Sequence, residues 1–204
     1  MKTIKLLLFA LLISSATYAQ KSQVFTTPDI VWFGLDYSKV KCIGPEGFTE
    51  PDQIVGRYFD GWNDLMISEE AKYDFKDAYD KASRINDLEK VNERNTMPSA
   101  DDLVIKESYA FEPGTLEEIV MDYQTDKYPG KIGLLYVVES LNKYESHAAI
   151  FMVFFDIPSG EILFSQKHFG KAGGFGFRNY WARSIYEVMK DSGNQFSKAA
   201  KKYK

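Results

Sequence analysis

The sequence predicts a single α/β (α+β) domain in which one mixed sheet is covered by about three helices. Three observations lead to this fold class. Residues 132–169 read as consecutive strands, and three other segments repeat apolar side chains at helical spacing. The length of residues 20–204 suits one domain with a substantial core.

The strand signal is strongest between residues 132 and 169. Segments 132–141, 146–157 and 161–169 are joined by short polar turns, which predicts an antiparallel three-strand meander. Residues 148–155 in the middle segment are all apolar. We therefore expect this strand to be covered on both faces and to lie in the centre of the sheet.

Other strands are indicated more locally. Alternating apolar residues at 30–37, continued at 40–43, predict the first strand. The charged segment 84–102 contains Asn, Ser and Pro, so a loop with one edge strand near residues 88–92 is expected there. Residues 103–109 are expected to add another strand.

The helices are predicted near residues 50–66, 115–124 and 177–191. Thr115 and Glu118 have the spacing of a capping box at the start of the second helix. The third helix carries a stripe of large apolar residues, and Gly193 is expected to end it.

Residues 1–19 predict a cleavable signal peptide. Lys2 and Lys5 precede the apolar run 6–13, and a small-x-small pattern ends at Ala19. Eight apolar residues fall short of the ~20 that span a bilayer, so no transmembrane segment is expected after cleavage. A lipidated protein would carry cysteine where Gln20 stands. We therefore expect a periplasmic or secreted protein, with residues 20–204 forming the domain.

Charge and cysteine content narrow the possible chemistry. The net charge is −4, and it becomes −6 once the two lysines of the signal peptide are removed. This balance argues against nucleic acid as a partner, because phosphate binding depends on clustered Lys and Arg. Cys42 is the only cysteine, so no intramolecular disulfide is possible. Its apolar strand predicts an inert thiol.

Catalytic and metal motifs are not found in the sequence. No serine lies in a nucleophile elbow. Asp36, Glu139 and Asp156 are acids in or near strands, for which strand-end capping and solvent exposure are commoner roles than general acid or base catalysis. We expect no catalytic residue and no cofactor.

The two histidines, His147 and His168, raise the question of a shared metal site, but the predicted hairpin turn argues against it. Residues 158–160 suit a three-residue loop with Gly160 in the left-handed conformation. That loop pairs Ile157 with Glu161 and places His147 and His168 on opposite faces of the sheet. A shared metal ion is therefore not expected.

The glycine-rich segment 170–176 has two interpretations. Backbone amides before a helix bind anions, and Lys171, Gly173, Gly174 and Arg178 could form such a ligand site. The spacing matches neither a P-loop nor a dinucleotide-binding fingerprint. A tight crossover, in which glycine lets the last helix approach the sheet, is the favoured explanation.

Three stretches resemble a family of secreted Gram-negative proteins of the Bacteroides type, whose function is unknown. They are residues 32–41, residues 139–157 and the segment 170–181. This resemblance brings no activity and no site residues. The hairpin 154–165 is more distantly similar to hairpins of the curli-secretion lipoprotein and of the amino-terminal domain of the Tol-system propeller protein. That similarity implies a mixed sheet flanked by helices.

Together these features favour a non-enzymatic envelope or secreted protein. It is expected to bind a protein or small-molecule partner through surface aromatic residues or the glycine-loop end of the sheet. The alternative is a domain that binds a small anionic ligand, or an unrecognised hydrolase, using the loop at residues 170–178.

Overall fold

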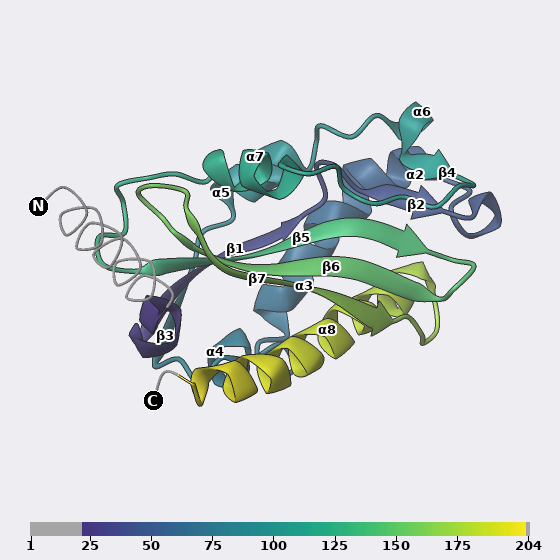
Figure 1. Ribbon diagram of the computed structural model, residues 1–204. Helices are drawn as coiled ribbons and strands as arrows, with labels where there is room; N and C mark the ends of the chain where they lie inside the picture. The colour runs from purple at the N-terminus through teal and green to yellow at the C-terminus, as the bar shows by residue number, and fades with distance from the viewer. Residues whose placement is uncertain (1–21, 203–204) are drawn as a thin grey trace, which may run out of the picture.

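The computed structural model describes residues 22–202 of the chain. The predicted signal peptide lies outside these residues. The sheet contains seven strands, and a long C-terminal helix runs along one side of it (Figure 1). The strands are β1 (Asp29–Asp36), β2 (Lys41–Ile43), β3 (Ser83–Asn86), β4 (Val104–Ile105), β5 (Ile132–Asn142), β6 (His147–Asp156) and β7 (Ile162–Lys171).

The helices fall between these strands and after the last one. The connection between β2 and β3 begins with a short 3₁₀ turn and includes one π-helical turn. Within the described residues they are η1 (Pro45–Gly47), α2 (Pro51–Gln53), η2 (Ile54–Tyr58), α3 (Phe59–Ser68), α4 (Phe75–Ala78), α5 (Glu89–Arg94), α6 (Ala100–Leu103), α7 (Thr115–Met121) and α8 (Phe177–Ala200).

The prediction of a sheet built on an antiparallel three-strand meander was wrong. Strands β3, β1, β5, β2 and β4 form a path in which every pairing is parallel. The antiparallel pairs β5–β6 and β6–β7 extend this parallel sheet on one side. Parallel neighbours need long crossover connections, so they join segments that are distant in the sequence and leave no local pattern.

Strand β5, rather than β6, occupies the centre of the sheet. It pairs with β6 along one edge, and with β1 and then β2 along the other. Strand β6 lies one position from the rim, between β5 and β7. Both faces of β6 are nevertheless covered, since Ile150 and Phe154 belong to one core and Val153 and Phe155 to the other.

Two hydrophobic cores lie on opposite faces of the sheet. The larger core includes buried side chains of α3, α4 and α8, and the smaller one includes side chains of α5 and α7. Figure 1 shows α5 and α7 on one face and α4 and α8 on the other. The expectation of about three covering helices did not include the short helices α5 and α6.

Several local predictions need correction. The expected edge strand at residues 88–92 is helix α5, and the strand of this region is β3 instead. Buried Val91 of α5 packs in the smaller core, on the face of the sheet opposite α8, which we call the outer face. The capping box is absent because Gly114, with φ of 89°, occupies the N-cap and Thr115 is already helical. Gly193 does not end α8, which continues to Ala200.

The hairpin between β6 and β7 agrees with the predicted turn in part. Gly160 has a φ of 70°, as expected. The loop is one residue longer, because the amide of Asp156 donates to the carbonyl of Glu161 at 2.9 Å. A bulge between Phe154 and Phe155 compensates, and His147 then pairs with Lys171 in the predicted register.

Within residues 22–202, no helix has both the length and the apolar character that crossing a membrane would require.

Candidate functional site

The glycine-rich segment brings α8 against the sheet. A Cβ atom on Gly170 would overlap the carbonyl oxygen of Ser184 in α8, so only glycine allows this approach. Gly174 and Gly176 have φ of 108° and 78°, a region that favours glycine. The predicted tight crossover is therefore confirmed at Gly170.

The four residues of the predicted ligand site do not converge on one point. The amide of Gly173 donates to the carbonyl of Tyr180 at 3.0 Å, so it is not available to an anion. Lys171 lies on β7, on the face turned away from α8, since Gly170 beside it faces Ser184. Gly174 is exposed in the loop between β7 and α8.

Arg178 lies in the first turn of α8, on the face of the sheet that α8 covers and near Tyr73. Burial raises the pKa of Tyr73, and the positive charges of Lys72 and Arg178 partly oppose this shift. The backbone carbonyl of Arg178 accepts a hydrogen bond from Trp62 Nε1 at 2.9 Å. Lys171 and Arg178 therefore lie on different sides of the sheet and do not frame a common anion.

Large aromatic side chains are exposed around this loop. Phe175 is 95% exposed, Phe169 is 60% exposed and Tyr144 is 57% exposed. Tyr144 lies in the β5–β6 turn, and the amide of Ala172 donates to the carbonyl of Ser146 at 2.8 Å, which holds this turn against the end of β7. We call the surface formed by Tyr144, Phe169 and Phe175 the aromatic end.

The neighbouring Phe177 behaves differently from Phe175. Its ring lies 4.7 Å from that of Tyr58 and 6.0 Å from that of Trp62, between centroids. Phe177 therefore contributes to the core beneath α8, whereas Phe175 contributes surface. The side chain of Phe175 does not fill the space beside Gly173.

A row of aromatic and charged side chains continues from the aromatic end across the outer face of the sheet. Lys167 Nζ lies 5.4 Å from the ring centroid of Phe151 and 5.5 Å from that of Phe169. It also forms an ion pair with buried Glu139. The ring of Phe111, from the segment before α7, stacks on Phe151 with centroids 5.7 Å apart.

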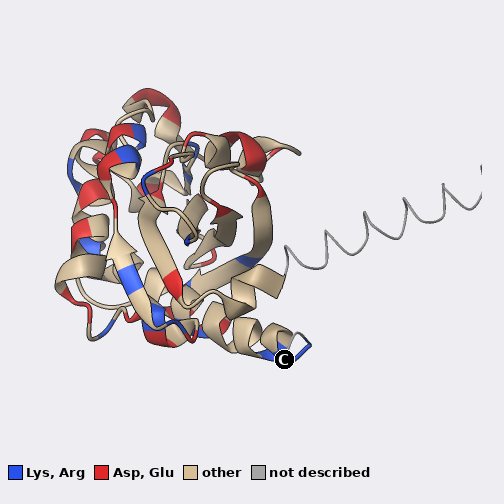
Figure 2. Ribbon diagram, turned by 90° about the vertical axis from the view of Figure 1, so that its left-hand side faces the viewer, with Lys and Arg blue, Asp and Glu red and all other residues tan. Residues whose placement is uncertain are grey.

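The segments that carry the aromatic end are positively charged, unlike the rest of the chain. Residues 143–147 and 167–183 contain five Lys or Arg side chains and one acid, Glu145. The facing loop, on which Lys143 packs at Gly47, adds Glu46. The whole chain has a net charge of −4. Figure 2, which views the molecule from the opposite end, shows acidic residues spread over the helices around the sheet.

The histidines lie on opposite faces of the sheet, as the hairpin register predicts. His168 is buried beneath α8, with its Nδ1 2.8 Å from Asp191 Oδ2. His147 contacts the outer-face ring of Phe169, with centroids 5.0 Å apart. The two imidazoles therefore cannot bind one metal ion.

Sequence reasoning missed a buried charge network at the carboxyl end of β1. Asp36 is fully buried, and its Oδ2 accepts hydrogen bonds from Arg94 Nε and from the Tyr123 hydroxyl, both at 2.7 Å. Its Oδ1 accepts from the amide of Ser38 at 2.8 Å and from the Ser38 hydroxyl at 2.6 Å. Four donors inside the protein therefore occupy the carboxylate oxygens of Asp36, which leaves no lone pair for a substrate. Through Arg94 and Tyr123, Asp36 also ties α5 and the segment that follows α7 to the sheet.

The other strand acids also have structural partners. Glu139 accepts a hydrogen bond from the amide of Phe111 at 2.9 Å, in addition to its ion pair with Lys167. Asp156 caps the hairpin turn by accepting from the amide of Ser159 at 3.1 Å. Cys42 is fully buried, and burial raises the pKa of its thiol. The predicted capping role agrees with this geometry for Asp156, whereas Asp36 and Glu139 are buried and paired; the buried position of Cys42 agrees with the expected inert thiol.

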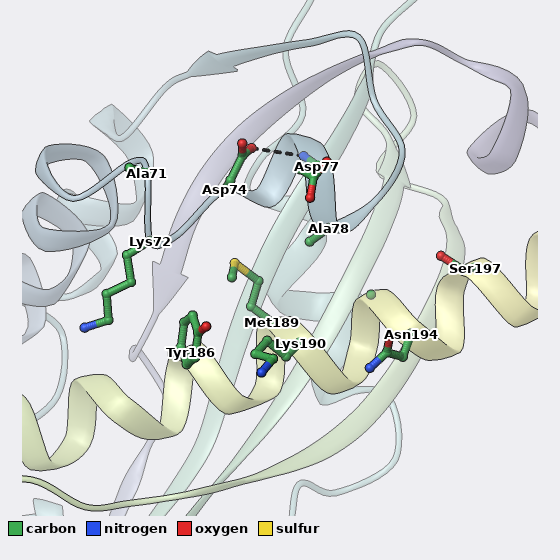
Figure 3. Close-up of a pocket in the computed structure, with 11 residues that line it drawn as sticks. Ala71, Lys72, Asp74, Asp77, Ala78, Tyr186, Met189, Lys190, Asn194 and Ser197 are labelled. Atoms are coloured by element: carbon green, nitrogen blue, oxygen red, sulfur yellow. Dashed lines mark hydrogen bonds between the residues drawn. The ribbon is translucent and has the colours of Figure 1, made fainter.

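An open groove of about 400 Å³ runs between α4 and α8 (Figure 3). Lys72 and Lys190 lie on either side of Tyr186, with Nζ to centroid distances of 6.0 Å and 5.5 Å. Asp74 Oδ1 accepts a hydrogen bond from the amide of Asp77 at 3.0 Å, as the N-cap of α4. Two acids, Asp74 and Asp77, line the groove together with the two lysines. The groove therefore favours neither an anionic nor a cationic ligand.

Comparison with known proteins identifies no relative, because no family model and no curated protein matches the chain. What the fold and the surface define is an α/β domain whose buried strand acids Asp36 and Glu139 have partners inside the protein, and whose exposed aromatic residues gather at one end. Its function has to be argued from that geometry.

Proposed function

We propose that this chain is an exported, non-enzymatic protein that binds a partner through the aromatic end. The observation that carries the proposal is the exposure of Phe175, Phe169 and Tyr144 around one loop. Large exposed aromatic side chains are enriched at the interaction sites of folded proteins. The predicted export, to the periplasm or beyond the cell, and the resemblance to secreted Gram-negative proteins belong to the same proposal.

The role of Phe175 is supported by the backbone that presents it. Two glycines with positive φ flank this side chain, so the loop turns sharply on both sides of it. A residue with only a packing role would be expected to turn inward, as Phe177 does. Aromatic side chains of this kind serve as anchors in protein interfaces.

Site-specific photocrosslinking tests the proposal. A photoreactive amino acid is placed at position 175 or 169 of the full chain, and the protein is incubated with envelope fractions of the producing cells. We expect a discrete adduct from both positions, and its loss when the other aromatic residue is changed to serine. The same probe at Met97 or Met121, which are exposed on other segments, is the matched control.

Two results would contradict the proposal. One is an adduct pattern that is identical at the aromatic end and at the control positions. The other is turnover by the purified protein on a broad panel of hydrolase substrates that disappears when a single acid or serine is replaced.

A further inference from the structure

Strand β7 is a rim strand with an edge that no strand occupies. Within residues 22–202 it pairs with β6 alone. In Figure 1 it runs at the side of the sheet nearest to α8. Such an edge exposes backbone donors and acceptors, which can pair with another extended chain.

The hydrogen-bond pattern identifies which residues of β7 present these groups. The amide of Ala172 donates to the carbonyl of Ser146, so the backbone of residue 172 points toward the β5–β6 turn and β6. Backbone direction alternates along an antiparallel strand, and the register is continuous from His147–Lys171 to Phe151–Lys167. The amide and carbonyl groups of Lys167, Phe169 and Lys171 therefore point to the free edge.

These three residues also carry the exposed side chains of the outer face. Phe169 is 60% exposed, and the two lysines beside it are exposed as well. In the described part of the chain, no element beyond the sheet donates to or accepts from their backbone groups. At this edge, backbone groups that point away from the sheet therefore occur at the same three residues as a lysine, a phenylalanine and a second lysine side chain.

A second copy of this chain does not suit the edge. Antiparallel self-pairing centred on Phe169 would set Lys167 of each copy opposite Lys171 of the other. Like charges directly across a strand pair are destabilising. A complementary strand instead needs an acid opposite Lys171 and an apolar residue opposite Phe169, whereas Lys167 already forms an ion pair with buried Glu139.

We propose that the free edge of β7 binds an extended acidic segment of a partner protein, in which acidic and apolar residues alternate. The segment adds one strand to the sheet, as peptides do in β-augmentation. A strand supplies the alternating donors and acceptors that the edge presents, which an anionic polysaccharide does not. This inference rests on the proposed binding function and names the chemistry of the partner.

The test uses the full mature chain and a fluorescent ten-residue peptide that alternates glutamate and valine. Binding is followed by fluorescence anisotropy. We expect saturable binding at least about ten-fold tighter than that of a peptide with five glutamates followed by five valines, which has the same charge. Alternate N-methylation of the peptide backbone should abolish binding, because it removes the donors that face β7.

Three variants locate the binding on the protein. Phe169→Ser and Lys171→Glu should each weaken binding of the alternating peptide by about three-fold or more, since each removes a cross-strand pair. Met97→Ser is the matched control and should leave the affinity unchanged, because Met97 is exposed on a segment outside β7. Equal melting temperatures of the variants establish that their fold is intact.

The outcomes separate this inference from the proposed function. Equal affinity for the two glutamate peptides, or for the N-methylated one, would overturn strand addition. Binding of a polyuronate in place of the peptides would also overturn it. In either case crosslinking at positions 169 and 175 could still succeed. That result would support the proposed binding function, with a partner other than an extended acidic segment.

Discussion

Asp36 and Lys81 are both buried charges, but their surroundings differ. Asp36 faces the guanidinium of Arg94 at 2.7 Å and has three further donors. Lys81 Nζ donates to the carbonyl oxygens of Val24 and Thr27 at 2.5 and 2.9 Å. A carbonyl compensates a buried ammonium less fully than a carboxylate does, so these residues respond differently to mutation and to pH.

Replacing Asp36 is predicted to destabilise the protein strongly. Asp36→Asn keeps the shape but removes the charge that balances Arg94, and breaking a buried ion pair costs about 3–5 kcal/mol. We expect a loss near the lower limit, because Arg94 also pairs with Asp122 at the surface. Urea unfolding measures the change in the free energy of unfolding.

The surface pair of Lys39 and Glu118 provides the control. Its charged atoms are 3.9 Å apart and both side chains are exposed, so Glu118→Gln should change the free energy of unfolding by less than about 0.5 kcal/mol. Equal losses for Asp36→Asn and Glu118→Gln would contradict the role of the buried network.

Lys81 is predicted to make stability rise with pH in the alkaline range. Burial lowers the pKa of Lys81 from 10.5 to about 8 in the folded protein. Between these two values the unfolded chain binds more protons than the folded one, so the free energy of unfolding increases with pH. Below about pH 8 the full penalty for charging the buried amine is present.

The measurement compares the wild type with Lys81→Met, which cannot titrate at this position. From pH 7.5 to 9.5 the wild-type free energy of unfolding should rise relative to that of the variant by about 1–2 kcal/mol. Taking the difference between the two proteins removes the contributions of other titrating groups. Parallel pH profiles for the two proteins would show that Lys81 is not responsible.

The packing of α8 depends on two glycines that allow close approach to other elements. Gly170 on β7 faces the backbone of Ser184, and a Cβ atom on Gly193 would lie 2.6 Å from the carbonyl oxygen of Ala78 in α4. The same helix buries Trp181 and Phe196 in the larger core. Its position over the sheet therefore depends on backbone contacts as well as on apolar burial.

Gly170→Ala is predicted to displace α8 and to destabilise the protein by roughly 3 kcal/mol or more, because an overpacked contact against backbone has little room to relax. The control is Gly61→Ala in α3, where a Cβ would meet no atom within 4 Å. That change should stabilise the protein by up to about 1 kcal/mol through helix propensity. Thermal unfolding distinguishes the two, and a loss on Gly61→Ala as large as that on Gly170→Ala would contradict the steric argument.

Across the whole molecule, apolar, cationic and aromatic side chains occupy different regions. Two cores fill both faces of the sheet, while cationic and aromatic residues gather at the glycine-loop end of an otherwise acidic chain. Such a separation of charge steers an acidic partner toward that end. It is consistent with the binding role that we propose.

Residues 1–19 predict that the chain is exported. When the full chain is produced in a Gram-negative host, we expect a mature protein that begins at Gln20. Intact mass and N-terminal sequencing of the periplasmic and culture fractions provide the measurement. A change of Ala19 to a bulky residue should block cleavage. Recovery of uncleaved chain from the cytoplasm alone would contradict the predicted signal peptide.

Sequence reasoning succeeded where the deciding interactions are close along the chain. The long apolar segments of β5 and β6, the left-handed Gly160 and the β6–β7 register follow from neighbouring residues and from turn chemistry. The helix that begins at Phe177 was also predicted. Its end was not, because Gly193 faces α4, a contact that cannot be recognised from the helix alone.

The parallel part of the sheet and most of the candidate site could not be predicted in this way. Strands β3 and β4 have four and two residues, too few for a periodic pattern, and α5 is positioned by Asp36 and Gly34 from a distant strand. The glycine-rich loop was recognised, but its proposed ligand residues face different directions. The exposed Phe169 beside it was not singled out, and Phe175 was considered only as a side chain to fill the space beside Gly173.

By itself, the sequence determined the absence of an intramolecular disulfide, the long strands and the general α/β composition, since these depend on local pattern and residue content; it also predicts export. Only the tertiary structure decided the strand order, the partners of the buried charges and the free edge of β7. Those features arise from contacts between distant segments, and neither exposure nor an unpaired edge exists for a residue until the rest of the chain has packed around it.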